Sequence, residues 1–306
     1  MKILLAGATG AIGTPLVPRL VAAGHEVVGL TRRPERARAL DDAGARGVVC
    51  DVIDRAATLA LADEVAPDVV VDQTTALPQR YDPRDMWSFY EGMVELRLRG
   101  TPNLVEAAQR TDARMVFQSI AFMYAPGGNG RLRTEDDPPY GREAPFPWNL
   151  ALPAIVALEG RVVDVGGLVL RYGMFYGPGT HFDDGQVAHD VKRRRLPVVG
   201  KGTGRWSFVH VEDAAAATVL AVERGITGIL NVVDDEPVPM REWLPMYARS
   251  IDAPRPLRVP VWPVRKFAPL AAHWGTTMPG ASNERARSEL GWRPERPTVR
   301  DGFPGT

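Results

Sequence analysis

The sequence has little of several features that would point to particular classes of protein. It contains a single cysteine, Cys50, so no disulfide can form within the chain and no cysteine cluster is available for zinc. We expect a reducing, cytoplasmic location and no metal site. Positive and negative side chains balance at 37 each, which argues against nucleic-acid or membrane partners. No apolar run approaches the ~20 residues of a membrane span.

What the sequence has instead is an alternation of short apolar runs and helical patterns in its first half. The apolar runs do not alternate with polar residues, which is typical of parallel strands covered on both faces. The expected strands are Lys2–Ala6, Glu26–Leu30, Gly47–Cys50, Asp68–Asp72, Arg114–Gln118 and Gly167–Arg171. The expected helices are Ala11–Ala23, Pro34–Ala43, Arg55–Val65 and the run Asp85–Arg110. The pattern predicts an α/β fold built on a Rossmann-type, doubly wound parallel sheet.

Beyond residue 174 this alternation gives way to loops, basic segments and short strands. Helices are still expected at Glu212–Arg224, Met240–Ser250 and Asn283–Leu290. We expect residues 1–173 to form a dinucleotide-binding core, to which the segment 206–232 returns, and residues 174–306 to form mainly a smaller substrate-binding lobe. Ligands of such sheets bind in the crevice at the carboxyl ends of the strands. The pattern leaves open whether the protein is a monomer or a homodimer.

The opening stretch, MKILLAGATGAIG, places Gly7, Gly10 and Gly13 between the first expected strand and the first expected helix. Gly7 permits a tight turn, Gly10 lets the backbone approach a pyrophosphate, and Gly13 lets the helix pack close to the strand. The phosphates would meet the unpaired N–H groups of the helix N-terminus. We therefore expect the loop to bind a dinucleotide, together with Thr9, Ala11 and Ile12.

The end of the second strand indicates which dinucleotide. A protein that prefers NAD usually has an acidic residue there, which binds the ribose hydroxyls. This chain instead reads GLTRRPER, with Arg32 and Arg33. Because the guanidinium group binds phosphate with a planar fork, we expect a 2′-phosphate site and therefore NADP(H), with NAD(H) less favoured. Asp51 and Val52, after the third strand, are expected beside the adenine.

Several stretches together resemble the extended short-chain dehydrogenase/reductase family, which includes NAD-dependent epimerases and dehydratases. They are GATGAIG, DVVVDQTTA, MVFQSIAFMYAPG, LVLRYGMFYGPGT, RWSFVHVEDAAAA and ELGWRPE. The resemblance covers nearly the whole chain and implies a nicotinamide-cofactor enzyme. It places Gln73, Thr74, Ala76, Tyr172 and Met174 near the cofactor.

The chain lacks the Tyr-x-x-x-Lys motif on which the chemistry of that family rests. Its four lysines are Lys2, Lys192, Lys201 and Lys266, and none has a tyrosine four residues before it. If Glu159 matches the family's Glu eight residues after the Tyr, the Tyr and Lys positions hold Ala151 and Ile155. Matching Tyr124 to the family's loop Tyr places Ile120 at the catalytic Ser/Thr position, with Ser119 one residue before it. Ser119 and Tyr124 are the candidate catalytic residues.

Aromatic and sulfur-containing side chains near the expected cleft predict a hydrophobic substrate site. The candidate substrate contacts are Phe122, Met123, Trp148, Tyr176, His181, Arg205 and Trp206. The function expected is NADPH-dependent reduction of a carbonyl group in a bulky hydrophobic or aromatic small molecule, with the proton from Ser119, Tyr124 or water. Two alternatives stay open: an epimerase, dehydratase or other non-redox enzyme of the same fold, and a catalytically silent NADP-binding sensor or scaffold.

Overall fold

The computed structural model describes residues 1–78, 86–127 and 129–303. Among these residues, seven parallel strands form one sheet in the order β11-β6-β5-β4-β1-β2-β3. The strands are β1 (Lys2–Ala6), β2 (Glu26–Thr31), β3 (Arg46–Val49), β4 (Val69–Asp72), β5 (Arg114–Ile120), β6 (Leu168–Tyr172) and β11 (Gly228–Val232). The predicted Rossmann-type sheet is therefore confirmed.

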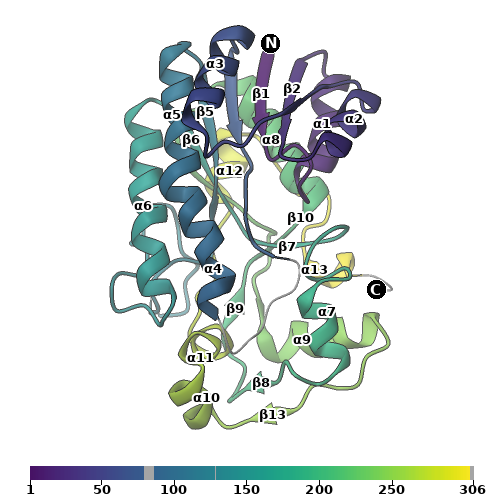
Figure 1. Cartoon of the computed structure of the whole chain (residues 1–306). Helices are drawn as coiled ribbons and strands as arrows, with labels where there is room; N and C mark the ends of the chain where they lie inside the picture. The colour runs from purple at the N-terminus through teal and green to yellow at the C-terminus, as the bar shows by residue number, and fades with distance from the viewer. Residues whose placement is uncertain (79–85, 128, 304–306) are drawn as a thin grey trace.

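Helices cover both faces of this sheet (Figure 1). One face carries α1 (Gly13–Ala22), α2 (Pro34–Asp42), α8 (Val211–Arg224) and α12 (Glu284–Glu289). The other carries α3 (Arg55–Val65), α5 (Thr101–Arg110) and α6 (Trp148–Asp164). The side chains of β1 show how the sequence builds both cores at once: Ile3 and Leu5 pack under the first set, whereas Leu4 and Ala6 pack under the second. Successive residues of a strand point to opposite faces, so a strand that is buried on both faces has to be apolar throughout.

The predicted elements match the observed ones to within about two residues, with two instructive differences. The run Asp85–Arg110 is broken into α4 (Met86–Glu95), a π-helical turn (Leu96–Gly100) and α5; Asp85 itself lies outside the described residues. The sequence analysis did not single out β11 as a strand, although it expected the segment 206–232 to return to the core. β11 pairs in parallel with β6 along its whole length.

The remaining elements gather below the carboxyl ends of the strands (Figure 1). Their strands are β7 (Met174–Tyr176), β8 (Val198–Val199), β9 (Arg205–Trp206), β10 (Phe208–His210), β12 (Val238–Pro239) and β13 (Arg258–Val259). Their helices are α7 (Gln186–Lys192), α9 (Met240–Ser250), α10 (Val261–Phe267), α11 (Pro269–Thr276) and α13 (Val299–Gly302). An aromatic core that includes Phe182, Phe208, Trp243 and Tyr247 holds much of this lobe together. The predicted division at residues 173 and 174 stays a prediction.

Candidate active site

A pocket of about 260 Å³ lies at the carboxyl ends of β1, β2, β3 and β4, closed on one side by α4. Ten predicted cofactor residues line it: Gly7, Thr9, Gly10, Arg32, Arg33, Asp51, Val52, Gln73, Thr74 and Ala76. The sequence analysis missed the other lining residues, Leu30, Thr31, Arg36, Cys50, Ile53, Thr75, Gly92, Glu95 and Leu96. The structure therefore brings together side chains from four strand ends that lie far apart in the sequence.

The glycine loop provides a cradle that side chains would fill. Gly7 has φ of +83°, and a Cβ atom there would lie 2.4 Å from the carbonyl oxygen of Gln73. A Cβ on Gly13 would lie 2.3 Å from the carbonyl oxygen of Gly7, so this glycine lets α1 start tightly against the turn. A Cβ on Gly10 would meet only the Gly7 oxygen, at 3.3 Å, and would otherwise project into open space. A pyrophosphate would fit against the Gly10 backbone, where the N-terminus of α1 favours negative charge.

Three arginines border the same pocket on the side of β2. Arg32, Arg33 and Arg36 are exposed, and none of them has a carboxylate within ion-pair distance in the part of the chain that the structure describes. Arg36 Nη1 donates to the carbonyl oxygen of Thr9 at 3.4 Å. It lies in the first turn of α2, and this hydrogen bond holds its guanidinium at the glycine loop. This concentration of unpaired positive charge is suited to a phosphate group.

Asp72 fixes the shape of the loop that follows β4. It is fully buried, accepts hydrogen bonds from the Thr74 backbone N–H at 2.9 Å and from the Thr101 hydroxyl at 2.8 Å, and lies 3.6 Å from the Arg97 guanidinium. A buried carboxylate needs such partners, because its desolvation is otherwise very costly. The loop that carries Gln73, Thr74 and Ala76 along the pocket is thereby held in place.

Five predicted cofactor residues do not line the pocket: Ala11, Ile12, Gly13, Tyr172 and Met174. Ala11, Ile12 and Gly13 form the turn into α1, next to the lining residue Gly10. Tyr172 is fully buried, and its hydroxyl lies 3.1 Å from Gln73 Nε2 and 2.7 Å from the Thr218 hydroxyl. It therefore supports the pocket from behind, through Gln73, and does not reach the cofactor side. Met174 is half-buried in β7, against the aromatic core of the lobe.

The two candidate catalytic hydroxyls both belong to a buried network behind the cleft. Ser119 donates to Glu159 at 2.5 Å, and Arg171 donates to both oxygens of Glu159 at 2.9 and 2.6 Å. Arg171 also donates to the Tyr124 hydroxyl at 2.9 Å, which in turn donates to Asn231 Oδ1 at 2.7 Å. Burial raises the pKa of Tyr124 to about 12. Both hydroxyls are buried and already hydrogen-bonded, and whether either of them donates a proton in catalysis stays a prediction.

The three residues that the resemblance matches to the Ser/Thr, Tyr and Lys positions of the family lie together in one buried cluster, and the match itself stays a prediction. Ala151 and Ile155 are buried on α6, and the half-buried Ile120 at the end of β5 packs against the same cluster. Met93 of α4 and Leu270 of α11 belong to it as well. The side chains of Ile120, Ala151 and Ile155 therefore contribute no group that can donate a proton.

The predicted substrate residues occupy three kinds of environment. Met123, Trp148, Tyr176 and Trp206 are buried in the aromatic and apolar cores, so in this structure they are packing residues. Phe122 and His181 are half-buried, and Phe122 stacks on Trp148 with ring centres 5.9 Å apart. Arg205 donates to the carbonyl oxygen of Gly130 at 3.1 Å. Whether any of the seven touches substrate stays a prediction.

Sequence reasoning missed the aromatic residues that surround Trp148. Trp274 of α11 meets Trp148 edge-on at 5.6 Å, and His273 lies 6.1 Å from Trp148 and 5.1 Å from Tyr140. Burial lowers the pKa of His273 to about 4, so the ring is neutral at pH 7. These residues come from segments more than a hundred positions apart, and only the tertiary fold unites them.

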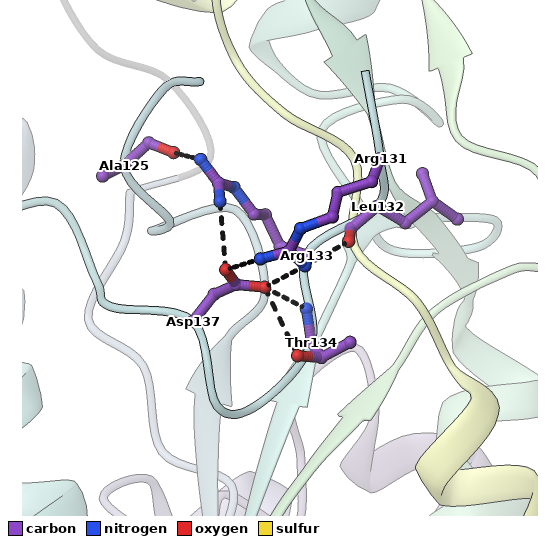
Figure 2. Close-up of polar contacts among 6 residues, drawn as sticks. All are labelled: Ala125, Arg131, Leu132, Arg133, Thr134 and Asp137. Carbon is purple, nitrogen blue, oxygen red and sulfur yellow. Dashed lines mark hydrogen bonds and ion pairs between the residues drawn. The ribbon is translucent and has the colours of Figure 1, made fainter. Parts of the chain in front are cut away.

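The loop between β5 and α6 is fastened by one carboxylate (Figure 2). Asp137 accepts from Arg131, from Arg133 at 3.0 Å, and from the backbone N–H of Thr134 at 2.9 Å. These partners, Arg131 first, hold the pKa of Asp137 well below its ordinary value. Arg133 also donates to the carbonyl oxygen of Ala125 at 2.9 Å. These hydrogen bonds and ion pairs hold the loop that carries Tyr124 and Tyr140 in its conformation.

Two negative findings complete the description of the site. Among the described residues, no helix has the length and apolar character needed to cross a bilayer. The same residues contain no group of three or more His, Cys, Asp or Glu side chains placed to hold a metal ion.

Fold and pocket together define a nucleotide-binding α/β protein, and comparison with known proteins gives its family. The family model for the NAD dependent epimerase/dehydratase family matches residues 3–232, and the chain belongs to that family. It is an oxidoreductase of the NAD(P)-dependent epimerase/reductase type. The predicted resemblance and the prediction of an enzyme are thereby confirmed, and the reading as a catalytically silent sensor is set aside.

Three relatives show the range of this family around the chain. A 3-diazoavenalumate denitrifying reductase from Streptomyces sp is 46% identical over 310 residues, covering 99% of each chain. A 2-alkyl-3-oxoalkanoate reductase from Stenotrophomonas maltophilia is 26% identical over 271 residues, covering 83% of this chain and 77% of that one. The structure of a Thermus thermophilus UDP-glucose 4-epimerase complex with NAD has a TM-score of 0.73 at 25% identity, covering 96% and 94%.

Proposed function

We propose that this protein reduces an aromatic diazo compound in its cationic diazonium form, replacing the diazo group by hydrogen and releasing dinitrogen, with NADPH as hydride donor. The proposal rests on two observations, one from sequence comparison and one from the structure. The chain is 46% identical, end to end, to a denitrifying reductase that acts on a diazo compound. It also lacks the Tyr-x-x-x-Lys motif, and the residues that the resemblance matches to the family's proton relay, Ile120, Ala151 and Ile155, carry no proton donor.

The chemistry of the two possible reductions explains why this pairing matters. Reduction of a ketone adds a hydride to carbon and a proton to oxygen, so an acid is needed. Reduction of a diazonium cation adds only a hydride: the carbon–nitrogen bond breaks, a carbon–hydrogen bond forms, and both nitrogen atoms leave as dinitrogen. Charge and atoms balance without a proton. An enzyme for the second reaction can therefore lose the Tyr-x-x-x-Lys pair.

The residues present fit a phosphorylated nicotinamide cofactor. The glycine loop would hold the pyrophosphate, Arg32, Arg33 and Arg36 would hold a 2′-phosphate, and Asp51 and Val52 would lie beside the adenine. When bound, the reduced cofactor supplies the hydride. The absence of an acidic residue at the end of β2 supports a preference for NADP(H) over NAD(H).

The chain's own residues would act mainly by positioning and by excluding water. Asp72 holds the loop from Gln73 to Ala76 against the pocket. Ile120, Ala151 and Ile155 would make the surroundings of the reacting atoms apolar, which would protect a reactive cation from hydrolysis. The half-buried ring of Phe122, which stacks on the buried Trp148, would pack against an aromatic substrate, and a cation is attracted to its face.

A second candidate is the reduction of a carbonyl group in a bulky aromatic or hydrophobic molecule. The 26% identity to a 2-alkyl-3-oxoalkanoate reductase favours it, since that name describes a substrate with a ketone. In this protein the proton would have to come from water, because Ser119 and Tyr124 are engaged behind the cleft.

A product analysis separates the two candidates. Purified protein is incubated with NADPH and either a para-substituted benzenediazonium salt or the corresponding aryl ketone, with parallel samples that lack protein. We expect protein-dependent oxidation of NADPH with the diazonium salt, with one equivalent each of dinitrogen and arene. Oxidation of NADPH with the ketone, and no acceleration with the diazonium salt, would replace the first candidate by the second.

A further inference from the structure

A second pocket is lined mainly by residues of α9 and of the segment 253–258. In Figure 1, α9 and β13 lie at the end of the molecule opposite to β2 and α2. The pocket encloses about 600 Å³ between one side of α9 and the segment 253–258, which runs back from the end of that helix. The opposite side of α9 is buried in the aromatic core through Trp243, Leu244 and Tyr247. Because the core fixes the helix, the pocket has a stable wall.

Arginines are concentrated around this pocket. Five line it, Arg241, Arg249, Arg255, Arg258 and Arg300, with Glu242 as the one lining carboxylate among the described residues. The chain as a whole has no net charge, so an excess of four positive charges around one hollow is a strong local departure. Like charges that share a concave site repel one another, and a bound anion removes that repulsion.

The ion pairs of the pocket leave three of these arginines available. Glu242 lies 3.3 Å from Arg241 and 2.6 Å from Arg300, so its charge is already engaged. Arg300 is further paired with Glu236 at 3.1 Å. Arg249, Arg255 and Arg258 are exposed and have no carboxylate within ion-pair distance across residues 1–78, 86–127 and 129–303. They come from both walls of the pocket, so one ligand could meet guanidinium groups on two sides.

Six apolar residues line the pocket beside the arginines: Val198, Pro245, Met246, Ala248, Ala253 and Pro256. The guanidinium fork matches the oxygens of a phosphate group, and apolar side chains next to it would bind an aliphatic body. We infer that this pocket is a second ligand site, for a small organic phosphate whose charged group is held by Arg249, Arg255 and Arg258 and whose apolar part contacts these residues. The inference is independent of the proposed reaction at the first pocket.

The test uses calorimetric titration of the full chain, saturated with NADP⁺, with butyl phosphate and with inorganic phosphate at low salt. We expect butyl phosphate to bind at least about threefold more tightly than inorganic phosphate, because part of its alkyl chain is buried. The double variant Arg249→Ala/Arg255→Ala should weaken butyl phosphate at least about tenfold. Glu242→Gln should tighten it, because this variant removes the negative charge and releases Arg241.

The matched control is Arg142→Ala/Arg265→Ala, which removes the same charge from two exposed sites outside the pocket and should change the affinity less than twofold. All substituted side chains lie at the surface or are half-buried, and thermal unfolding checks that each variant folds. The arginines of the first pocket are the same in all variants. A difference in affinity for butyl phosphate between variants therefore comes from the second pocket. The inference is overturned if butyl phosphate does not bind, if it binds no better than inorganic phosphate, or if both double variants lose the same affinity.

Discussion

Ser119 donates a hydrogen bond of 2.5 Å to Glu159, the same carboxylate that Arg171 holds with two further bonds. All three residues are at most 4% exposed. Ser119 therefore belongs to a buried polar network, while its neighbour Ile120 packs against the apolar cluster that holds Ala151 and Ile155. Adjacent residues of β5 thus point into a polar and an apolar environment.

Removal of either candidate hydroxyl should leave catalysis largely intact. We expect Ser119→Ala and Tyr124→Phe to change kcat less than about threefold, whereas loss of a general acid costs about 10²–10⁴-fold. Both should lower the free energy of unfolding by about 1–3 kcal/mol, since a buried polar partner is left unpaired. Steady-state kinetics and urea unfolding check this together. A drop in kcat above a hundredfold, with unchanged stability, would restore the hydroxyl as a catalytic group.

The arginines of the first pocket should discriminate between the two nicotinamide cofactors. Arg32→Ala should weaken NADPH at least about tenfold and NADH less than twofold, because only NADPH carries the 2′-phosphate. Arg38→Ala is the control, because Arg38 is an exposed arginine of the nearby helix α2 that does not line the pocket. Fluorescence titration gives both affinities. Equal losses for the two cofactors would refute the phosphate assignment.

The glycine loop can be tested with two glycines that have the same backbone conformation. Gly7 and Gly24 have φ of +83° and +80°, but an added Cβ would lie 2.4 Å from the Gln73 carbonyl oxygen at Gly7 and would meet nothing within 4 Å at Gly24. Both alanine variants carry the cost of positive φ, about 1 kcal/mol. Gly7→Ala should in addition abolish cofactor binding. If Gly24→Ala weakens cofactor binding as much as Gly7→Ala does, the loss of binding comes from general destabilisation and not from filling the glycine loop.

Local patterns predicted the parts of this site that depend on local conformation. Some pocket residues come just after a strand in the sequence, and their position relative to that strand predicts that they lie at the edge of the sheet. They are the glycine loop, Arg32, Arg33 and Asp51. Glu95 and Leu96 reach the pocket only because α4 packs across it, and β11 joins the sheet only through its pairing with β6. Such contacts depend on tertiary structure, which periodicity does not contain. Ser119 illustrates the sharpest limit, because a shift of one residue in a strand turns a side chain to the opposite face.

Asp234 should make the protein less stable as the pH rises. It is 1% exposed, and burial, followed by the nearby charge of Asp213, raises its pKa well above the ordinary value. The folded state therefore holds a proton that the unfolded state releases above pH ~4. Stability falls with increasing pH from about 4 up to the folded-state pKa.

Asp234→Asn should remove this dependence. The free energy of unfolding of the variant minus that of the parent chain should therefore be larger at pH 8 than at pH 5. Urea unfolding at the two pH values measures the difference. Asp164→Asn, which removes an exposed carboxylate at the end of α6, is the control. A greater loss of stability at pH 8 in Asp234→Asn than in the parent would show that the charged carboxylate stabilises the fold.

Proton uptake tests most directly the claim that this enzyme transfers a hydride without an acid. The reaction of NADPH with a para-methylbenzenediazonium salt is followed in weak buffer, with absorbance and a pH indicator recorded together and the protein-free rate subtracted. The account predicts that no proton is taken up for each NADPH oxidised. Uptake of one proton per NADPH, as ketone reduction requires, would contradict it.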